Sequence, residues 1–449
     1  MHLKGGSRWT DGAIAVSPAS DENHESVGMS LWGQIMKTSP TRIYMPKGDL
    51  TYLDPFFEAL TKADSQSVRV MHYGDSQLEG DRMTSVIREY LQSTFGGMGP
   101  GMLAAVQPVG SYTVSQSVSP SGIGCYRIYG PTDWRASHHR YGPMCQMSRI
   151  EGKATLNYTC VGGDKYKHSR TFNRVTVLMK GSGSISAFAA GQTVSLKDVG
   201  GDANGLRIFS ANLAQAVSRV TVNIAGPMDV YGVLLDGRVG VQVDNIAQRG
   251  SSGTIFTAID RNTIEPYFRD NRVDLIILQF GGNAVPYLKT EAKREYFQKE
   301  VRRQVALFRS IAPKAKILYI GPADMSTCVG GEMVSYPMMA DVEACLREAV
   351  NAEGAAFWDM YAAQGGDGAM VRWVNATPAL GGPDYIHFTP RGAEKMAGIF
   401  VETLEMYYKY YRLRKFGSDS LESDTTAVDT AKAATPKPAT TSAPTDKAS

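Results

Sequence analysis

Two kinds of hydrophobic pattern alternate along the chain, and the first predicts α/β structure. A short apolar run from Val68 to Tyr73 predicts a strand. The apolar residues that follow it recur every three or four positions, as on one face of a helix. They are Met83, Val86, Ile87, Tyr90 and Leu91. We therefore expect a strand that leads directly into a helix.

The same order of strand and helix returns in the last part of the chain. Strands are predicted at 274–280, 316–320 and 355–358. The predicted helices carry apolar faces made by Phe297, Val301, Val305 and Phe308, then by Val342, Leu346 and Val350, and finally by Met396, Ile399, Phe400 and Leu404. Thr389-Pro390 supplies an N-cap and a first-turn proline for the last helix. Such alternation predicts a mostly parallel sheet covered on both faces.

Between residues 110 and 236 the pattern changes to a period of two. Apolar residues alternate with polar ones, and glycine-rich turns separate the stretches. The alternating positions include Ala154, Leu156, Tyr158 and Cys160, then Val175, Val177 and Met179, and then Val220, Val222 and Ile224. Short strands at this spacing need two packed sheets to hide their inner faces, so we expect an inserted all-β sandwich of jelly-roll type.

These changes divide the chain into five parts. Residues 1–38 form a polar leader, which we expect to be flexible, and residues 417–449 form a tail too poor in large apolar residues to fold. The α/β domain occupies residues 39–109 and 237–416, and the β-sandwich at 110–236 interrupts it.

Composition narrows the class of protein. The 449 residues suggest two or three domains, and 43% hydrophobic with 20% charged residues is normal for a soluble globular protein. The net charge of +3 gives no indication of nucleic acid or an anionic membrane surface as a partner. No apolar run is long enough to span a bilayer, and the first thirty residues lack the apolar core of a signal peptide.

The five cysteines do not form a metal or redox motif. Their number is odd and no C-x-x-C pair occurs, which argues against a zinc site or a dithiol redox site. We interpret them as small buried hydrophobic residues. One disulfide among Cys125, Cys145 and Cys160 stays open as an alternative. We expect no cofactor and no metal.

Candidate catalytic residues lie in three loops, two after predicted strands and one before the last helix. A serine, Ser76, follows the first strand, and Asn283 follows the strand at 274–280. A serine hydroxyl needs a base to attack a carbonyl, and His387 is a suitable base because Asp384 precedes it by three residues. In an open parallel sheet, such loops gather at the carboxyl ends of the strands.

Together these blocks resemble the SGNH, or GDSL, hydrolase superfamily. Gly74-Asp75-Ser76 matches its serine block, Gly281-Gly282-Asn283 its asparagine block, and Asp384 to His387 its final D-x-x-H block. The glycine block resembles residues 245–251, with Gly250 at the oxyanion position and Gly253 as a near competitor. The resemblance implies a flavodoxin-like doubly wound parallel sheet. It also implies Ser76 as nucleophile, His387 as general base and acid, Asp384 as its orienting partner, and an oxyanion hole of Ser76, Gly250 and Asn283.

Within that superfamily, the chain resembles the bacterial peptidoglycan O-acetylesterases. The features are a G-D-S-Q block followed by Gly80-Asp81, and a β-sandwich inserted before the glycine block. Gln77 departs from the pattern, since some relatives carry histidine there. The resemblance implies an acetylated glycan as substrate, a periplasmic or extracellular location, and an insert similar to a carbohydrate-binding module. Aromatic residues of the insert that could stack on sugars are Tyr126, Tyr129, Trp134, Tyr141, Tyr158 and Tyr166.

Three functions remain open at this point. The first is a carbohydrate esterase that removes O-acetyl groups through an acetyl-serine intermediate. The second is a glycan O-acetyltransferase with the same triad, working with surface or membrane-associated acyl-transfer machinery. The third is a glycan-binding protein without catalysis, against which the intact set of Ser76, Asp384 and His387 argues.

Overall fold

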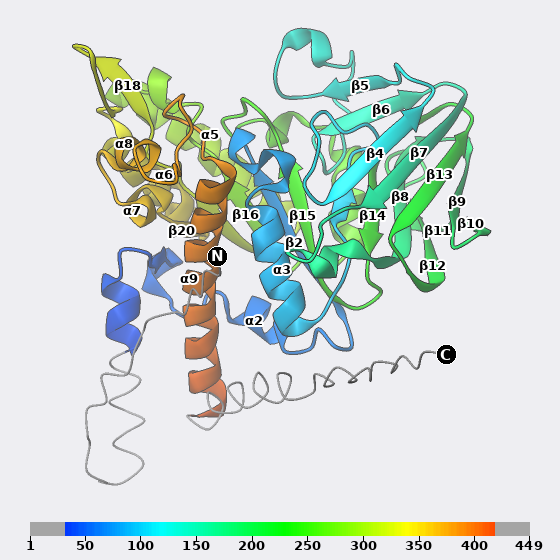
Figure 1. Cartoon of the computed structure of the whole chain (residues 1–449), viewed down its shortest axis with the longest axis horizontal. Coiled ribbons are helices and arrows are strands. Elements are labelled where there is room, and N and C mark those ends of the chain that lie inside the picture. The colour runs from blue at the N-terminus through cyan, green and yellow to red at the C-terminus, as the bar shows by residue number, and fades with distance from the viewer. Residues whose placement is uncertain (1–31, 418–449) are drawn as a thin grey trace, which may run out of the picture. The chain divides into compact units, whose positions relative to one another are not determined.

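A six-stranded, mostly parallel sheet organises the chain. The computed structural model describes residues 32–417 (Figure 1). The strand order is β1-β20-β17-β16-β2-β15, and every neighbouring pair is parallel except β1 with β20. The strands are β1 (Ile43–Tyr44), β2 (Ser67–Gly74), β15 (Gly240–Ala247), β16 (Leu275–Gln279), β17 (Lys316–Ile320) and β20 (Ala356–Trp358). Apart from the antiparallel edge strand β1, this is the 2-1-3-4-5 order of flavodoxin-like sheets. The predicted parallel sheet is confirmed.

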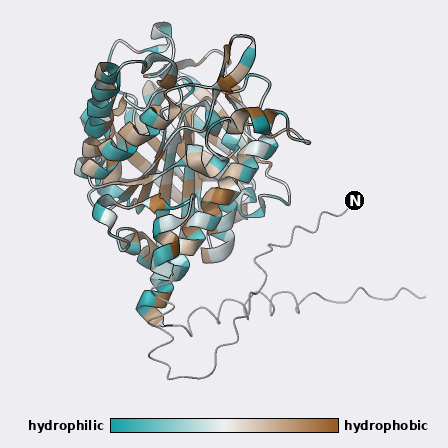
Figure 2. Cartoon of the chain, turned by 90° about the vertical axis from the view of Figure 1, so that its left-hand side faces the viewer, coloured by the Kyte–Doolittle hydropathy of each residue, from teal (hydrophilic) through white to brown (hydrophobic). Residues whose placement is uncertain are grey.

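Helices cover this sheet, and the longer ones agree with the prediction. They are α2 (Asp54–Leu60), α3 (Thr84–Phe95), α4 (Glu265–Asp270), α5 (Glu291–Ile311), α6 (Met339–Ala352), α7 (Met360–Gln364), α8 (Ala369–Val374) and α9 (Pro390–Phe416). The apolar faces predicted for α5 and α6 are buried in the core. Figure 2 shows the strands of the interior in the hydrophobic colour and many residues of the surrounding helices in the hydrophilic one. The short helices α2, α4, α7 and α8 were not predicted.

The chain divides into two compact units. Residues 39–406 hold all the sheets of the described chain. In the other unit, residues 32–38 are helical, although they belong to the predicted polar leader, and Tyr407 donates a 3.5 Å hydrogen bond to the Met36 carbonyl. The rest of the predicted leader, 1–31, and the predicted tail beyond Gly417 lie outside the described residues. Between residues 32 and 417, no helix combines enough length and apolar character to cross a membrane.

The stretch between α3 and β15 folds into two antiparallel sheets. The first has the order β10 (Gln192–Ser195), β9 (Ser184–Ala189), β13 (Arg219–Ala225), β7 (Lys153–Cys160) and β4 (Val114–Ser119). The second has β11 (Lys197–Gly201), β12 (Arg207–Val217), β8 (Phe172–Gly181), β14 (Met228–Asp236), β6 (Gln146–Ile150) and β5 (Gly124–Arg127), with β3 (Gly101–Leu103) paired to β14. Leu156 and Val222 of the first sheet share one core with Val177 and Val233 of the second. The period-two stretches are therefore strands whose apolar sides face each other.

The outer side of the second sheet packs against the α/β domain. Tyr231 and Leu234 of β14 belong to the same buried cluster as Tyr73 of β2 and Ile246 of β15. The glycine-rich segment after α3 runs through this junction, where a Cβ atom at Gly97 would overlap the Val241 carbonyl. Glycine there permits the close approach of the two backbones.

The register of three strands brings the candidate loops together. Gly74 at the end of β2 lies opposite Ala247 of β15 on one side and Gln279 of β16 on the other. Because all three strands are parallel, the loops that follow them leave the same edge of the sheet. This places the loops of Ser76, Gly250 and Asn283 next to one another.

Candidate active site

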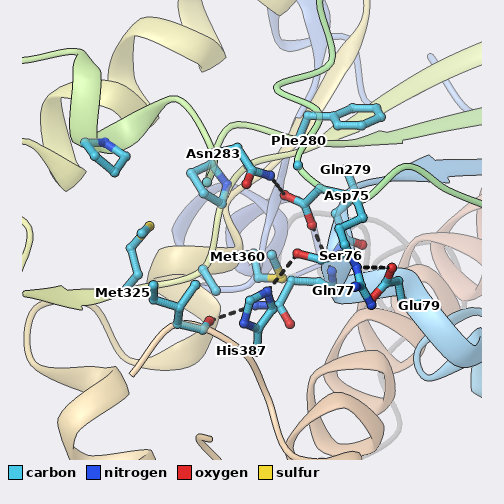
Figure 3. Close-up of a pocket in the computed structure, with 18 of the residues that line it drawn as sticks. Asp75, Ser76, Gln77, Glu79, Gln279, Phe280, Asn283, Met325, Met360 and His387 are labelled. Atoms are coloured by element: carbon cyan, nitrogen blue, oxygen red, sulfur yellow. Dashed lines mark hydrogen bonds and ion pairs between the residues drawn. The ribbon is translucent and has the colours of Figure 1, made fainter. Parts of the chain in front are cut away.

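Three side chains predicted from the sequence form a continuous chain of hydrogen bonds. The Ser76 Oγ lies 2.7 Å from His387 Nε2 (Figure 3). On the other side of the ring, His387 Nδ1 lies 2.7 Å from Asp384 Oδ2. If the imidazole proton is on Nδ1, it is donated to Asp384, and Nε2 can accept the serine proton. This arrangement lets a neutral imidazole take a proton from an attacking hydroxyl.

The turn before α9 holds Asp384 as an anion facing the imidazole. Its Oδ1 accepts 3.0 Å hydrogen bonds from the backbone N–H groups of Ile386 and His387. Partial burial by itself would raise the pKa of the Asp384 carboxyl, but the His387 ring and these N–H donors together hold it below its ordinary value. Tyr385 adopts a positive φ of 56°, which closes the turn.

Ser76 begins a sharp turn directly after β2. It is the first residue of the 3-10 helix η2 (Ser76–Asp81), and the Asp75 side chain caps that helix by accepting from the Gln77 N–H at 2.9 Å. Only 7% of Asp75 is exposed, and burial raises the pKa of its carboxyl to about 6 despite this hydrogen bond. The Asp75 side chain therefore organises the turn that carries Ser76.

Asn283 and Gly250 flank the serine. The Asn283 Nδ2 donates to the Ser251 carbonyl at 3.0 Å and to Asp75 Oδ2 at 3.3 Å, which fixes the amide beside the Ser76 turn. Gly250 has a φ of 77°, and a Cβ there would meet no atom within 4 Å, so its backbone faces open space in the pocket. The competing Gly253 has a similar φ, but it packs against the Phe280 ring and is not among the residues that line the pocket. The geometry therefore favours Gly250 over Gly253.

Two further side chains, for which the sequence predicts no role, hold the histidine loop. The Gln77 Nε2 donates to the Ile386 carbonyl at 2.9 Å, while its Oε1 accepts from the Phe388 N–H at 3.2 Å. These two hydrogen bonds hold the backbone in place on both sides of His387. Arg82 adds a second connection, because it donates to the Ser76 carbonyl at 2.5 Å and to the Phe388 carbonyl at 3.1 Å. Together they tie the serine turn to the histidine turn.

These groups open onto a pocket of about 570 Å³. Ser76, Gly250, Asn283 and His387 line it, and its remaining wall is partly apolar. The apolar part comes from Phe280, Pro286, Pro322, Ala323, Met325, Met360 and Ile386. A cavity of this volume is large enough for an acyl group together with part of the molecule that carries it, and the Glu79 and Arg249 side chains add polar groups to its lining.

Several residues named from the sequence lie elsewhere. Tyr129, Tyr141 and Tyr158 of the insert are buried in the core, so their rings are not available to a sugar in this structure. All five cysteines are free thiols, and the disulfide considered among Cys125, Cys145 and Cys160 is not formed. Within residues 32–417, no group of three or more His, Cys, Asp or Glu side chains is placed to hold a metal ion.

One family model matches part of the chain. The model of the GDSL-like lipase/acylhydrolase family matches residues 189–395, a range that holds Gly250, Asn283, Asp384 and His387 but begins after Ser76. A comparison with curated proteins gave no match.

Among solved structures, one described as a peptidoglycan O-acetylesterase in action is 19% identical to this chain. The match has a TM-score of 0.65 and covers 79% of this chain and 96% of that one, which shows a shared fold. Family two carbohydrate esterases from Cellvibrio japonicus and Clostridium thermocellum are each 12% identical. They cover 66% and 64% of this chain and 99% and 100% of their own, at TM-scores of only 0.26 and 0.28. The family match over residues 189–395 and the shared fold together support an esterase of the SGNH, or GDSL, type.

Proposed function

We propose that the protein is a serine esterase that removes O-acetyl groups from a carbohydrate, namely a cell-wall glycan such as peptidoglycan. The observation that carries this proposal is the chain of two 2.7 Å contacts from Ser76 through His387 to Asp384, beside a pocket of about 570 Å³ that Ser76 and His387 line. The fold shared with a peptidoglycan O-acetylesterase supports the choice of substrate.

In the first half of the reaction, Ser76 Oγ attacks the acetyl carbonyl and its proton passes to His387 Nε2. Asp384 stabilises the imidazolium that forms, because its carboxylate accepts the Nδ1–H. The tetrahedral intermediate then collapses. The bond to the sugar oxygen breaks, that oxygen takes the proton from Nε2, and the acetyl group stays on Ser76.

In the second half, His387 takes a proton from water and the resulting hydroxide attacks the acetyl-serine. Collapse of the second tetrahedral intermediate returns the proton to Ser76 and releases acetate. In both halves we assign the oxyanion to the N–H groups of Ser76 and Gly250 and to the Asn283 amide, which exchanges its 3.3 Å contact with Asp75 Oδ2 for the oxyanion. Donors of this kind are typically worth about 3 to 4 kcal/mol each in the transition state.

Hydrolysis is favoured over acetyl transfer by the exposure of the triad. The side chains of His387 and Asp384 are 37% and 49% exposed, so water reaches the imidazole that would activate it. A transferase must instead exclude water from its acyl-enzyme. We further propose that the sandwich at residues 110–236 is a jelly-roll domain similar to a carbohydrate-binding module, and that the protein works in the periplasm or outside the cell.

The test is acetate release from O-acetylated peptidoglycan and from other acetylated glycans. The wild-type protein should release acetate, and a Ser76→Ala variant should not. Ser115→Ala, which changes an exposed serine of β4, serves as the matched control and should keep full activity. Equal release by wild type and Ser76→Ala would overturn the serine mechanism. Transfer of acetyl to an added sugar in place of acetate release would favour the transferase.

A further inference from the structure

Two tyrosines beside the active site are unusually exposed. Tyr287 is 71% exposed and Tyr296 is 67% exposed, which makes them the two most exposed large apolar side chains among residues 32–417. Rings of this size normally bury much of their surface, so an exposed pair at the rim of a site is informative. Neither residue was singled out from the sequence, because a lone tyrosine near a helix start carries no pattern.

Both tyrosines line a shallow hollow that adjoins the catalytic pocket. Tyr287 ends the 3-10 helix η7 (Val285–Tyr287), four residues after Asn283, and lines the catalytic pocket as well as the hollow. Tyr296 lies on the exposed side of α5, next to the buried Phe297. The hollow measures about 390 Å³, and Ser252, Thr254 and Glu300 contribute polar groups to it. Tyr287 thus lines both cavities.

We propose that this hollow, which we call the tyrosine platform, binds a sugar ring adjacent to the acetylated one in the glycan chain. The tyrosine rings would stack on the C–H face of the pyranose, and the polar groups of Ser252 and Thr254 would meet its hydroxyls. Tyrosine suits this task because it supplies a large rigid contact at a low cost in side-chain entropy. This proposal rests on the proposed function, and it places the recognition of this adjacent sugar ring on the hydrolase domain.

The other side of the catalytic pocket is less suited to a sugar. There the cavity that leads toward the insert measures only about 90 Å³. Glu79 and Arg249, which line both cavities, close this direction with two 2.6 Å hydrogen bonds. The aromatic ring in this cavity, Tyr129, is 3% exposed. A glycan chain that extends out of the catalytic pocket would therefore meet an exposed aromatic surface on the η7 side and an ion pair on the insert side.

The experiment compares acetylated oligosaccharides of peptidoglycan with an acetylated monosaccharide. The wild type should prefer the oligosaccharide, as measured by the ratio of the two kcat/KM values. Tyr287→Ala and Tyr296→Ala should each reduce this ratio about 5- to 30-fold through a higher KM for the oligosaccharide. Tyr287→Phe and Tyr296→Phe, which keep the ring, should retain the ratio within about twofold.

Phe416→Ala is the matched control, because Phe416 is an exposed aromatic residue at the end of α9 that lines neither cavity and lies outside the insert. It should leave the ratio unchanged. The proposal is overturned if both tyrosine-to-alanine variants keep the wild-type ratio, or if Phe416→Ala reduces the ratio as much as they do.

A wild type that releases no acetate from any glycan overturns the proposed function instead. In that case, the tyrosine-platform proposal is tested by measuring the binding of the same oligosaccharides to the wild type and to the tyrosine variants. Binding lost in the alanine variants supports it, and binding that is absent or unchanged overturns it.

Discussion

Replacement of Gln77 tests whether the two catalytic turns must be held together. Its side chain is 8% exposed and bonds to the backbone on both sides of His387, at Ile386 and Phe388. Gln77→Ala removes both bonds and leaves a space. Gln77→Met removes both bonds but fills most of the space with a flexible side chain of similar length. The pair of variants therefore separates the hydrogen bonds from the packing.

The two hydrogen bonds contribute about 1 kcal/mol each, or about 2 kcal/mol together. If this energy keeps His387 in line with Ser76, its loss corresponds to a decrease of about 30-fold in kcat. We expect this decrease in both variants, with KM for a small acetyl ester changed by less than about threefold. Gln77→Ala should also lose more thermal stability than Gln77→Met, because it leaves a cavity.

The assay is steady-state hydrolysis of a small acetyl ester as a function of pH, together with thermal unfolding. A displaced histidine should alter the pH profile of kcat/KM as well as its maximum. If both variants keep wild-type kcat while their melting temperatures fall, Gln77 supports the fold and does not position His387. Full activity in Gln77→Met alone would show that packing, and not hydrogen bonding, holds the loop.

Three further predictions concern the polar groups around the serine. Asn283→Ala should lower kcat for acetyl ester hydrolysis by about 10²- to 10³-fold with little change in melting temperature, and an activity within threefold of wild type would remove Asn283 from the oxyanion hole. Asp384→Asn should lower kcat by about 10⁴-fold, because an amide donor facing Nδ1 selects the wrong imidazole tautomer, and near-normal kcat would contradict this role. Asp75 is buried with its pKa raised to about 6, so its contribution to stability is complete below its ordinary pKa near 4 and is lost as the pH rises through about 6. Asp75→Asn should therefore raise the melting temperature relative to wild type more at pH 8 than at pH 5, and an equal difference at both pH values would contradict the assignment.

The elements that could be predicted from the sequence are those whose burial follows a simple period. The run at 274–280 became β16 because it is apolar on both faces of the sheet, and the spacing of Phe297, Val301 and Val305 became the buried side of α5. The strand β15 was not predicted as such. It contains the buried polar residues Gln242 and Asp244, so it lacks the continuous apolar run expected of a central parallel strand.

The candidate site likewise contains residues that could be predicted from the sequence and residues that could not. Ser76, Asn283, Asp384 and His387 occur in short blocks with a recognisable order, and the parallel register brings those blocks together. The hydrogen bonds by which Gln77 and Arg82 connect the serine turn to the histidine turn could not be predicted. The partners of Gln77 are backbone groups more than three hundred positions away, and no sequence motif marks a backbone partner. The same holds for Tyr287 and Tyr296, whose exposure is known only once the fold has placed them.

The most direct test of the central claim is the labelling of the protein with a serine-directed organophosphonate, followed by mass spectrometry of its peptides. We predict one adduct, on Ser76, formed rapidly by the wild type and much more slowly by His387→Ala. A principal adduct on another residue, or an unchanged labelling rate in His387→Ala, would contradict the account in which His387 activates Ser76.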